Sequence, residues 1–313
     1  MFKGKTLVEL AASALGNREG ERLTGRKLAE TIVEENPDWV ESKRKKSKNQ
    51  SIKDGGISEM ILQVQAEIGS NKYSIEKHPN LRMTEDRPRR YYYTSLTEEQ
   101  EVEAVEGEAV GVEPKEFKEH DLYPRLSEYL ATEHGVYSKR INELRSSNRH
   151  GPRGNQWLHP DLIGFEAMGR RWSDTIRQLV SARSDPETRL WSFEVKKLIN
   201  RSNAREVFFQ ALSNSAWANL GYLVAAEISG SGTLDELRML SAQHGIGVIL
   251  LSVHEETETT ILVQAQPKSA IDWSAADRLC VENVDAAEVF RQVRVYHQSG
   301  EINIQFWDSN VPG

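Results

Sequence analysis

Apolar residues recur at helical spacing in the first third of the chain. They predict three amphipathic helices, over residues 6–15, 25–35 and 58–68. Thr24 stands directly before the second of these and is a suitable N-cap. Two short strand-like pieces follow, at residues 73–76 and 91–94. Three helices followed by a β hairpin is the element order of a winged-helix domain.

Beyond residue 117 the pattern changes, because short apolar runs alternate with amphipathic segments. The runs predict strands over residues 161–166, 190–195, 222–226, 247–253 and 259–266. The amphipathic segments predict helices over residues 122–132, 205–217, 234–244, 275–281 and 286–294. The alternation favours an α/β (α+β) fold for this part of the chain.

The two patterned regions are separated by the run TEEQEVEAVEGEAVGVEPKE, which is acidic and lacks large aromatic residues. We interpret residues 96–116 as a linker between a domain at residues 1–95 and a second domain at residues 117–313. The alternative interpretation is a solvated acidic helix, which would also separate two domains.

Composition narrows the class of protein. The longest apolar runs fall far short of the ~20 residues that a membrane-spanning helix needs, so no membrane span is expected. Cys280 is the only cysteine, which rules out an intramolecular disulfide and a zinc site built on several cysteines. The first residues do not resemble a secretory signal, so we expect a cytoplasmic protein.

The net charge of −7 would seem to disfavour a nucleic-acid partner. The charge is unevenly distributed, however, since Lys and Arg outnumber Asp and Glu within residues 1–95 and are outnumbered in the rest of the chain. The first domain is therefore the better candidate for contact with a polyanion.

Two short segments place polar residues inside or beside apolar strands. These are His159-Pro160-Asp161 and Glu194-Val195-Lys196. The two-residue period of a strand puts Glu194 and Lys196 on one face and turns Val195 to the other. Charges among aromatic and aliphatic neighbours destabilise the fold unless they are paired or bind an ion. An ordinary ion pair at a sheet edge is the structural alternative.

Hydrolysis of a phosphodiester requires the groups that these segments carry. The carboxylates of Asp161 and Glu194 are hard oxygen ligands that suit Mg²⁺ or Mn²⁺. Such an ion polarises a phosphoryl oxygen and lowers the pKa of a bound water. A lysine at the position of Lys196 can orient or deprotonate that water and balance charge on phosphorus.

The order of three segments resembles the PD-(D/E)xK restriction-endonuclease fold, similar to the Mrr type. The segments are Pro160-Asp161, Glu194-Val195-Lys196 and the later Phe208-Phe209-Gln210-Ala211-Leu212. The resemblance covers roughly residues 119–255. It implies a mixed central sheet flanked by helices, metal binding by Asp161 and Glu194, activation of water by Lys196, and support of the site by Gln210. Glu119 and Glu128 are further candidate metal ligands. The excursion over residues 167–189 is longer than a minimal hairpin and departs from the pattern.

The N-terminal region resembles the HARE-HTH domain, a winged-helix module proposed to bind DNA and to sense modified bases. A basic run interrupts the pattern between the second and third predicted helices, with Lys43, Arg44, Lys45, Lys46 and Lys48 as candidate phosphate contacts. A solvated basic loop is an equal alternative. Tyr91, Tyr92 and Tyr93 could stack on bases, although strand residues more often pack on a core.

A Gly-rich loop before the Pro-Asp segment offers a second set of DNA contacts, of which we single out Arg153 and Asn155, beside Asn148, Arg149 and His150. Loop flexibility alone also explains its glycines. No His pair has metal-ligand spacing, and the chain lacks a Walker A sequence and a Gly-x-Ser-x-Gly elbow. The sequence therefore offers no starting point for an HNH nuclease, an ATPase or a serine hydrolase.

Together these features and resemblances predict a Mg²⁺-dependent DNA endonuclease that acts in restriction or phage defence. Sensing of modified DNA is what the HARE-HTH resemblance implies. One rival is a DNA-binding regulator whose nuclease fold has lost activity. Another is an N-terminal domain that binds a protein partner and makes no contact with DNA. Cutting of both strands would indicate a homodimer, because one metal centre cuts one strand.

Overall fold

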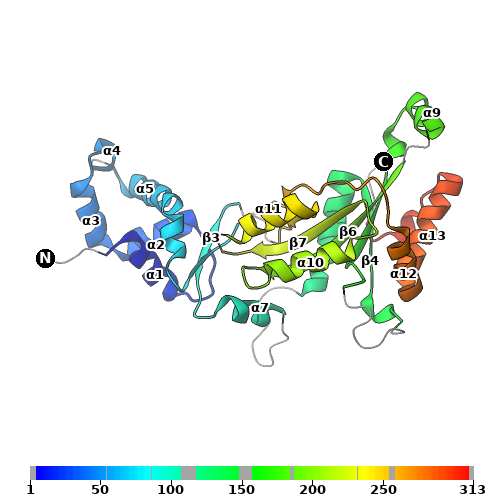
Figure 1. Ribbon diagram of the computed structural model, residues 1–313. Helices are drawn as coiled ribbons and strands as arrows, with labels where there is room; N and C mark the ends of the chain where they lie inside the picture. Colours follow the sequence, from blue (N-terminus) through cyan, green and yellow to red (C-terminus); the bar gives the residue numbers. More distant parts are fainter. Residues whose placement is uncertain are drawn as a thin grey trace.

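A computed structural model describes residues 5–53, 55–85, 87–106, 118–147, 157–183, 187–230, 232–253 and 258–309. The elongated molecule has a helical part at the N-terminal end and a sheet-based part at the other (Figure 1). We refer to residues 5–93 as the N-terminal module and to residues 118–309 as the sheet module. Within the described ranges, no helix combines the length and apolar character needed to cross a membrane.

The N-terminal module packs helices against a small antiparallel sheet. Its elements are α1 (Leu7–Gly16), β1 (Leu23–Thr24), α2 (Gly25–Glu35), α3 (Pro37–Lys46), α4 (Gln50–Lys53), α5 (Ile57–Ser70), α6 (Lys72–Glu76), β2 (Leu81–Met83) and β3 (Arg90–Tyr93). The sheet order is β1-β3-β2. As predicted, Thr24 caps α2, since its hydroxyl accepts the backbone N–H of Lys27.

The structure corrects two local predictions for this module and decides between the alternatives for a third. Most of the basic run is helical, because α3 continues to Lys46. Residues 73–76 belong to helix α6 and are not a strand. Tyr91 and Tyr92 are buried, at 3% and 2% exposure, so they pack on the core and are not available to stack on bases.

Part of the predicted linker is a helix, α7 (Glu98–Glu106), that packs against the sheet module. The segment is thus an acidic helix, as the alternative interpretation has it, but it is not solvated on all sides, since Glu101 and Val102 are buried. Residues 107–117, the remainder of the predicted linker, lie outside the described ranges.

The sheet module is built on a six-stranded sheet of order β4-β5-β6-β7-β8-β9. The strands are β4 (Val136–Arg140), β5 (Leu162–Ala167), β6 (Thr188–Ile199), β7 (Leu220–Ile228), β8 (Gly247–Leu250) and β9 (Thr260–Val263). The pairs β6-β7 and β7-β8 are parallel, and the other pairs are antiparallel. The predicted α/β class with a mixed central sheet is confirmed.

Helices cover both faces of this sheet. Helix α8 (Leu122–Tyr129) contributes to the core on one face, and α10 (Ala204–Asn214) and α11 (Thr233–His244) contribute to the core on the other. A third core forms where α12 (Trp273–Glu282) and α13 (Val284–Ser299) pack beside β5. Helix α9 (Asp174–Arg183) lies in the long excursion between β5 and β6 and projects from the body (Figure 1).

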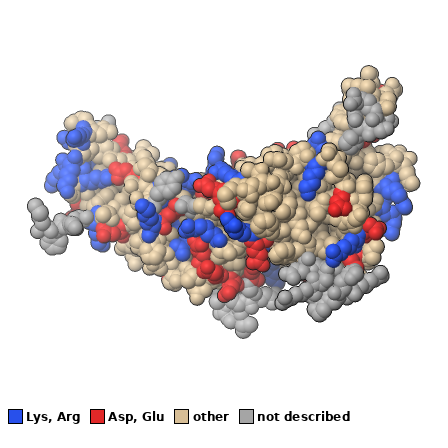
Figure 2. Space-filling model, viewed as in Figure 1, with Lys and Arg blue, Asp and Glu red and all other residues tan. Residues whose placement is uncertain are grey.

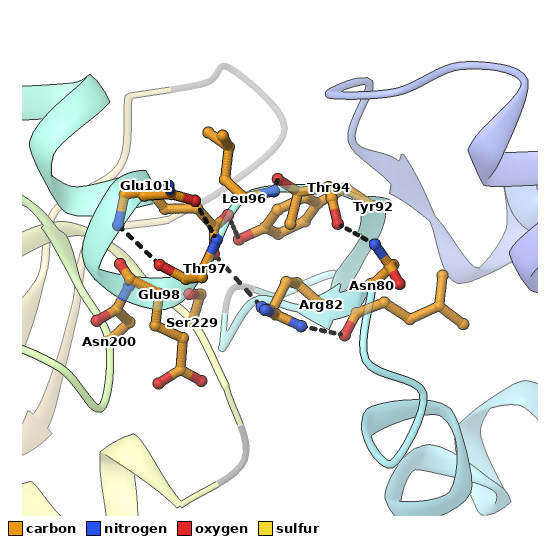
Figure 3. Close-up of polar contacts among 12 residues, drawn as sticks. Asn80, Arg82, Tyr92, Thr94, Leu96, Thr97, Glu98, Glu101, Asn200 and Ser229 are labelled. Carbon is orange, nitrogen blue, oxygen red and sulfur yellow. Dashed lines mark hydrogen bonds and ion pairs between the residues drawn. The ribbon is translucent and has the colours of Figure 1, made fainter.

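The two modules contact each other directly. Arg22 donates two hydrogen bonds to the carboxylate of Glu227, from Nε at 2.7 Å and from Nη2 at 3.1 Å. The backbone N–H of Glu85 donates to the carbonyl of Ile228 at the end of β7. Side chains of β2, β3, α7 and the sheet module meet at this junction (Figure 3).

Candidate active site

Asp161 and Glu194 lie opposite each other on neighbouring strands. Leu162 pairs with Phe193, and continuing this antiparallel register by one residue places Asp161 opposite Glu194. Pro160 precedes Asp161, lacks a backbone N–H and ends the pairing there. On β6, the backbone N–H of Val195 donates to Asp161 Oδ2 at 2.7 Å. The end of β5 thus fixes the carboxylate of Asp161 at the edge of β6.

The alternation of β6 separates the apolar residues from the charged ones. Trp191, Phe193 and Val195 belong to the core that α8 covers. Glu194 and Lys196 point the other way, as the two-residue period predicts, and Lys196 Nζ lies 2.6 Å from Glu194 Oε1. The side chains are only 2% (Glu194) and 13% (Lys196) exposed, so the pair is largely removed from water.

Helix α10 supplies a further partner to Glu194. Asn214, in its last turn, donates from Nδ2 to Glu194 Oε2 at 2.6 Å and is itself buried. Gln210, which the resemblance implies as the supporting residue, lies one turn earlier on α10 and is half-buried. The hydrogen bond to Glu194 thus comes from Asn214 and not from Gln210. Because Asn214 is four residues after Gln210, helical periodicity was the signal that could have indicated it.

Tyr123 brings a third carboxylate to the site. Its hydroxyl donates to Glu119 Oε1 at 2.8 Å and lies 3.4 Å from Asp161 Oδ1. Arg140 stacks its guanidinium over the Tyr123 ring, with its carbon 4.8 Å from the ring centre. Glu119 is therefore beside Asp161, as considered from the sequence. Glu128 is exposed on the opposite side of α8 from the buried Tyr123 and Leu126.

The electrostatics of the site follow from burial and close charges. Burial raises the pKa of Asp161 well above its usual range, and the charge of Glu194 adds to the effect. Burial also raises the pKa of Glu194, against the opposing influence of Lys196 and Asn214. Burial alone would lower the pKa of Lys196, but Glu194 and Asp161 together outweigh it and raise the pKa, so Lys196 remains cationic.

The donor set fits a hard divalent cation. Asp161, Glu194 and Glu119 provide carboxylate oxygens around one ammonium, so the negative charge is in excess when all are ionised. Among the described residues, no three His, Cys, Asp or Glu side chains are already gathered as a metal cage. Mg²⁺ does not require such a cage, since it keeps several waters and binds through one or two carboxylates together with substrate phosphates.

The candidate DNA contacts fall into two groups. Lys43 lies 2.6 Å from Glu67, Lys45 pairs with Glu41, and Arg44 donates to the Gly56 carbonyl. Lys46 and Lys48 are exposed, and within the described ranges no acidic partner is found for either. Lys and Arg gather at the end of the molecule formed by α3 and α4 (Figure 2). Arg153 and Asn155, with Asn148, Arg149 and His150, lie outside the described residues.

Comparisons with known proteins leave the family open. No protein-family model matches this chain. None of the curated proteins matches it at a significant level. A solved structure of a protein of unknown function from Silicibacter pomeroyi aligns with 60% of this chain and 99% of its own length, at 12% identity and a TM-score of 0.30. That similarity is too low to carry an argument about fold or function.

Proposed function

We propose that the protein is a metal-dependent DNA endonuclease of the PD-(D/E)xK type, with a role in restriction or phage defence. The observation that carries the proposal is the placement of Asp161 opposite Glu194, with Lys196 on the Glu194 face of β6. Two carboxylates and a lysine at one strand edge can bind a metal ion, orient water and balance charge on phosphorus, which are the tasks of metal-assisted phosphodiester hydrolysis.

Each side chain has a distinct role in this proposal. Asp161 and Glu194 would hold Mg²⁺ or Mn²⁺, and the ion when bound would polarise the phosphoryl group and acidify a water. Lys196 presents its ammonium beside both carboxylates, where it can orient the attacking water and balance charge on phosphorus. Asn214 donates a hydrogen bond to the Glu194 carboxylate and so limits its rotation.

The N-terminal module is the proposed DNA-recognition part, as a winged-helix domain of the HARE-HTH type. Support comes from the exposed cations at the α3 and α4 end, which can contact phosphates without specificity for sequence. The order of helices followed by the β2 and β3 hairpin is also that of winged helices. A protein partner for this module is the alternative.

A DNA-binding regulator with an inactive nuclease fold is the second candidate function. The geometry favours the active enzyme, because Asp161, Glu194 and Lys196 are all present and adjacent. A regulator that only binds DNA would make no use of a second carboxylate beside the Glu194–Lys196 pair.

Incubation of the full-length protein with plasmids tests the activity itself. Modified and unmodified plasmids would each be incubated with Mg²⁺, with Mn²⁺ and with excess chelator. We expect cleavage with either ion and none with chelator. Binding of plasmid without cleavage under every condition would favour the regulator, and cleavage in excess chelator would contradict a metal site.

A further inference from the structure

Helix α7 contacts the N-terminal module through a buried polar network. The Tyr92 hydroxyl on β3 donates to Glu101 Oε1 at 3.0 Å, and Arg82 on β2 lies 3.4 Å from Glu101 Oε2 (Figure 3). Glu101 and Tyr92 are almost fully buried, and Arg22 stacks over the Tyr92 ring. Glu101 of α7 is therefore held by both strands of the hairpin.

The same helix also contacts the strand that carries the candidate site. Asn200, directly after β6, donates from Nδ2 to the Glu98 carbonyl at 2.8 Å and is fully buried. Asn200 is four residues beyond Lys196, a span of about 13 Å at the rise of an extended strand. One helix thus joins the hairpin of the N-terminal module to β6.

A second set of contacts fixes the modules beside α7. Arg22 and Glu227 form the bidentate ion pair, and Glu227 lies on β7, paired with Leu198 of β6. The Gly230 N–H donates to the Met83 carbonyl, and Thr84 bridges to Ser229. Backbone hydrogen bonds of this kind hold the end of β2 against the end of β7 in one register.

The charged groups at this junction are suited to fixing the orientation of one module relative to the other. Two arginines, Arg22 and Arg82, face two glutamates, Glu101 and Glu227, so its charges are balanced. Burying such groups adds little net stability, because desolvation offsets the attraction. If one module were displaced relative to the other, these buried charges would lose their partners. The resulting desolvation cost disfavours every alternative orientation of the modules.

We infer that α7 and the Arg22–Glu227 pair clamp the N-terminal module onto β6 and β7, so that the two modules move as one body. A clamp of this kind departs from the usual freedom of domains joined by a linker. The functional consequence rests on the proposed function: DNA read by the N-terminal module is delivered to Asp161, Glu194 and Lys196 at a fixed distance. Cleavage should then occur at a constant offset from the recognised site.

Distance measurements between spin labels test the clamp without any need for activity. Labels would be attached at Lys45→Cys on α3 and Asp235→Cys on α11, both exposed, in a Cys280→Ser background. We expect one narrow distance distribution for the full-length protein. Arg22→Glu and Glu101→Arg should each broaden it at least about twofold, towards the range of linked domains.

Two further variants control this experiment. Arg26→Glu makes the same charge change at an exposed position of α2 and should leave the distribution narrow. Arg22→Glu combined with Glu227→Arg restores opposite charges and should narrow the distribution again. Circular dichroism and thermal melts of every variant would separate opening of the junction from unfolding of a module.

The outcomes distinguish the inference from the proposed function. A broad distance distribution in the protein with the unaltered junction would overturn the clamp. So would a distribution that stays narrow in folded Arg22→Glu and Glu101→Arg variants. A narrow distribution that responds as expected supports it, even if no DNA is cut. Where DNA is cut, Arg22→Glu should spread the cleavage positions, and an unchanged offset would contradict the delivery of DNA at a fixed distance.

Discussion

The side-chain amide of Asn214 donates a 2.6 Å hydrogen bond to the Glu194 carboxylate from the last turn of α10. Lys196 holds the other oxygen of the same carboxylate. Both oxygens of Glu194 are therefore oriented before any ligand arrives. Groups that orient a metal-binding side chain in this way tune its affinity for the metal.

Replacing Asn214 should therefore weaken metal binding. Asn214→Leu keeps the side-chain size but removes the donor to Glu194, so we expect the affinity for Mg²⁺ to fall by roughly 10- to 100-fold. Calorimetric titration with Mg²⁺ measures this directly. Gln210→Leu, one turn earlier on α10, is the matched control and should change the affinity less. Equal losses from both substitutions would argue for a general packing effect.

Asp161→Asn distinguishes a metal site from a structural ion pair. At a metal site, removing one of two neighbouring charges should leave the ion-free protein as stable as before or slightly more stable. Mg²⁺ should raise the melting temperature of the unaltered protein more than that of the variant. A purely structural role for these charges instead predicts that Mg²⁺ leaves the melting temperature of both proteins unchanged, because Asp161→Asn keeps the Glu194–Lys196 pair intact. Thermal melts with and without Mg²⁺ decide between the two.

The cations at the end of α3 should differ in their contribution to DNA affinity. Lys46 and Lys48 are exposed, whereas Lys43 is engaged by Glu67. Replacing both Lys46 and Lys48 by Ala should reduce the slope of log affinity against log salt by about 2, or roughly 0.9 per phosphate contact. Lys43→Ala should change it less. If none of these substitutions alters the slope, the N-terminal module must bind a partner other than DNA.

Glu101 should give the protein a pH-dependent stability. Burial raises its pKa above the usual value, and Tyr92 and Arg82 oppose the shift without cancelling it. The folded state then binds this proton more tightly than the unfolded state, so stability decreases as pH rises from about 4.3 through the raised folded pKa. Glu101→Gln should flatten the decrease in urea-unfolding experiments. Glu41→Gln, at an exposed position, should leave it unchanged.

The sequence predicts the sheet module well where one signal dominates. Apolar runs indicated β5, β6, β7 and β8, and period-two alternation placed Glu194 and Lys196 on one face. The edge strand β4 was missed, since Val136 and Tyr137 follow a helix with only Gly135 between them. There the left-handed conformation of the glycine marks the change of element.

The errors arise where tertiary contacts outweigh local composition. The acidic segment containing Glu101 has the composition of a linker, yet in helix α7 Glu101 contacts Tyr92 and Arg82 of the preceding hairpin. The basic run is helical because Pro37 starts α3 and Val40 anchors it to the core. The role of Asn214 likewise could not be predicted from composition, because it depends on which end of α10 meets Glu194.

Cleavage by site variants tests the central claim most directly. Plasmid would be incubated in Mg²⁺ with the unaltered protein and with Asp161→Ala, Glu194→Ala and Lys196→Ala. Asp235→Asn, an exposed carboxylate on α11, serves as the control. We predict that each of the three substitutions abolishes cleavage while the control cleaves as the unaltered protein does. Equal cleavage by all five proteins would contradict the assignment of this site.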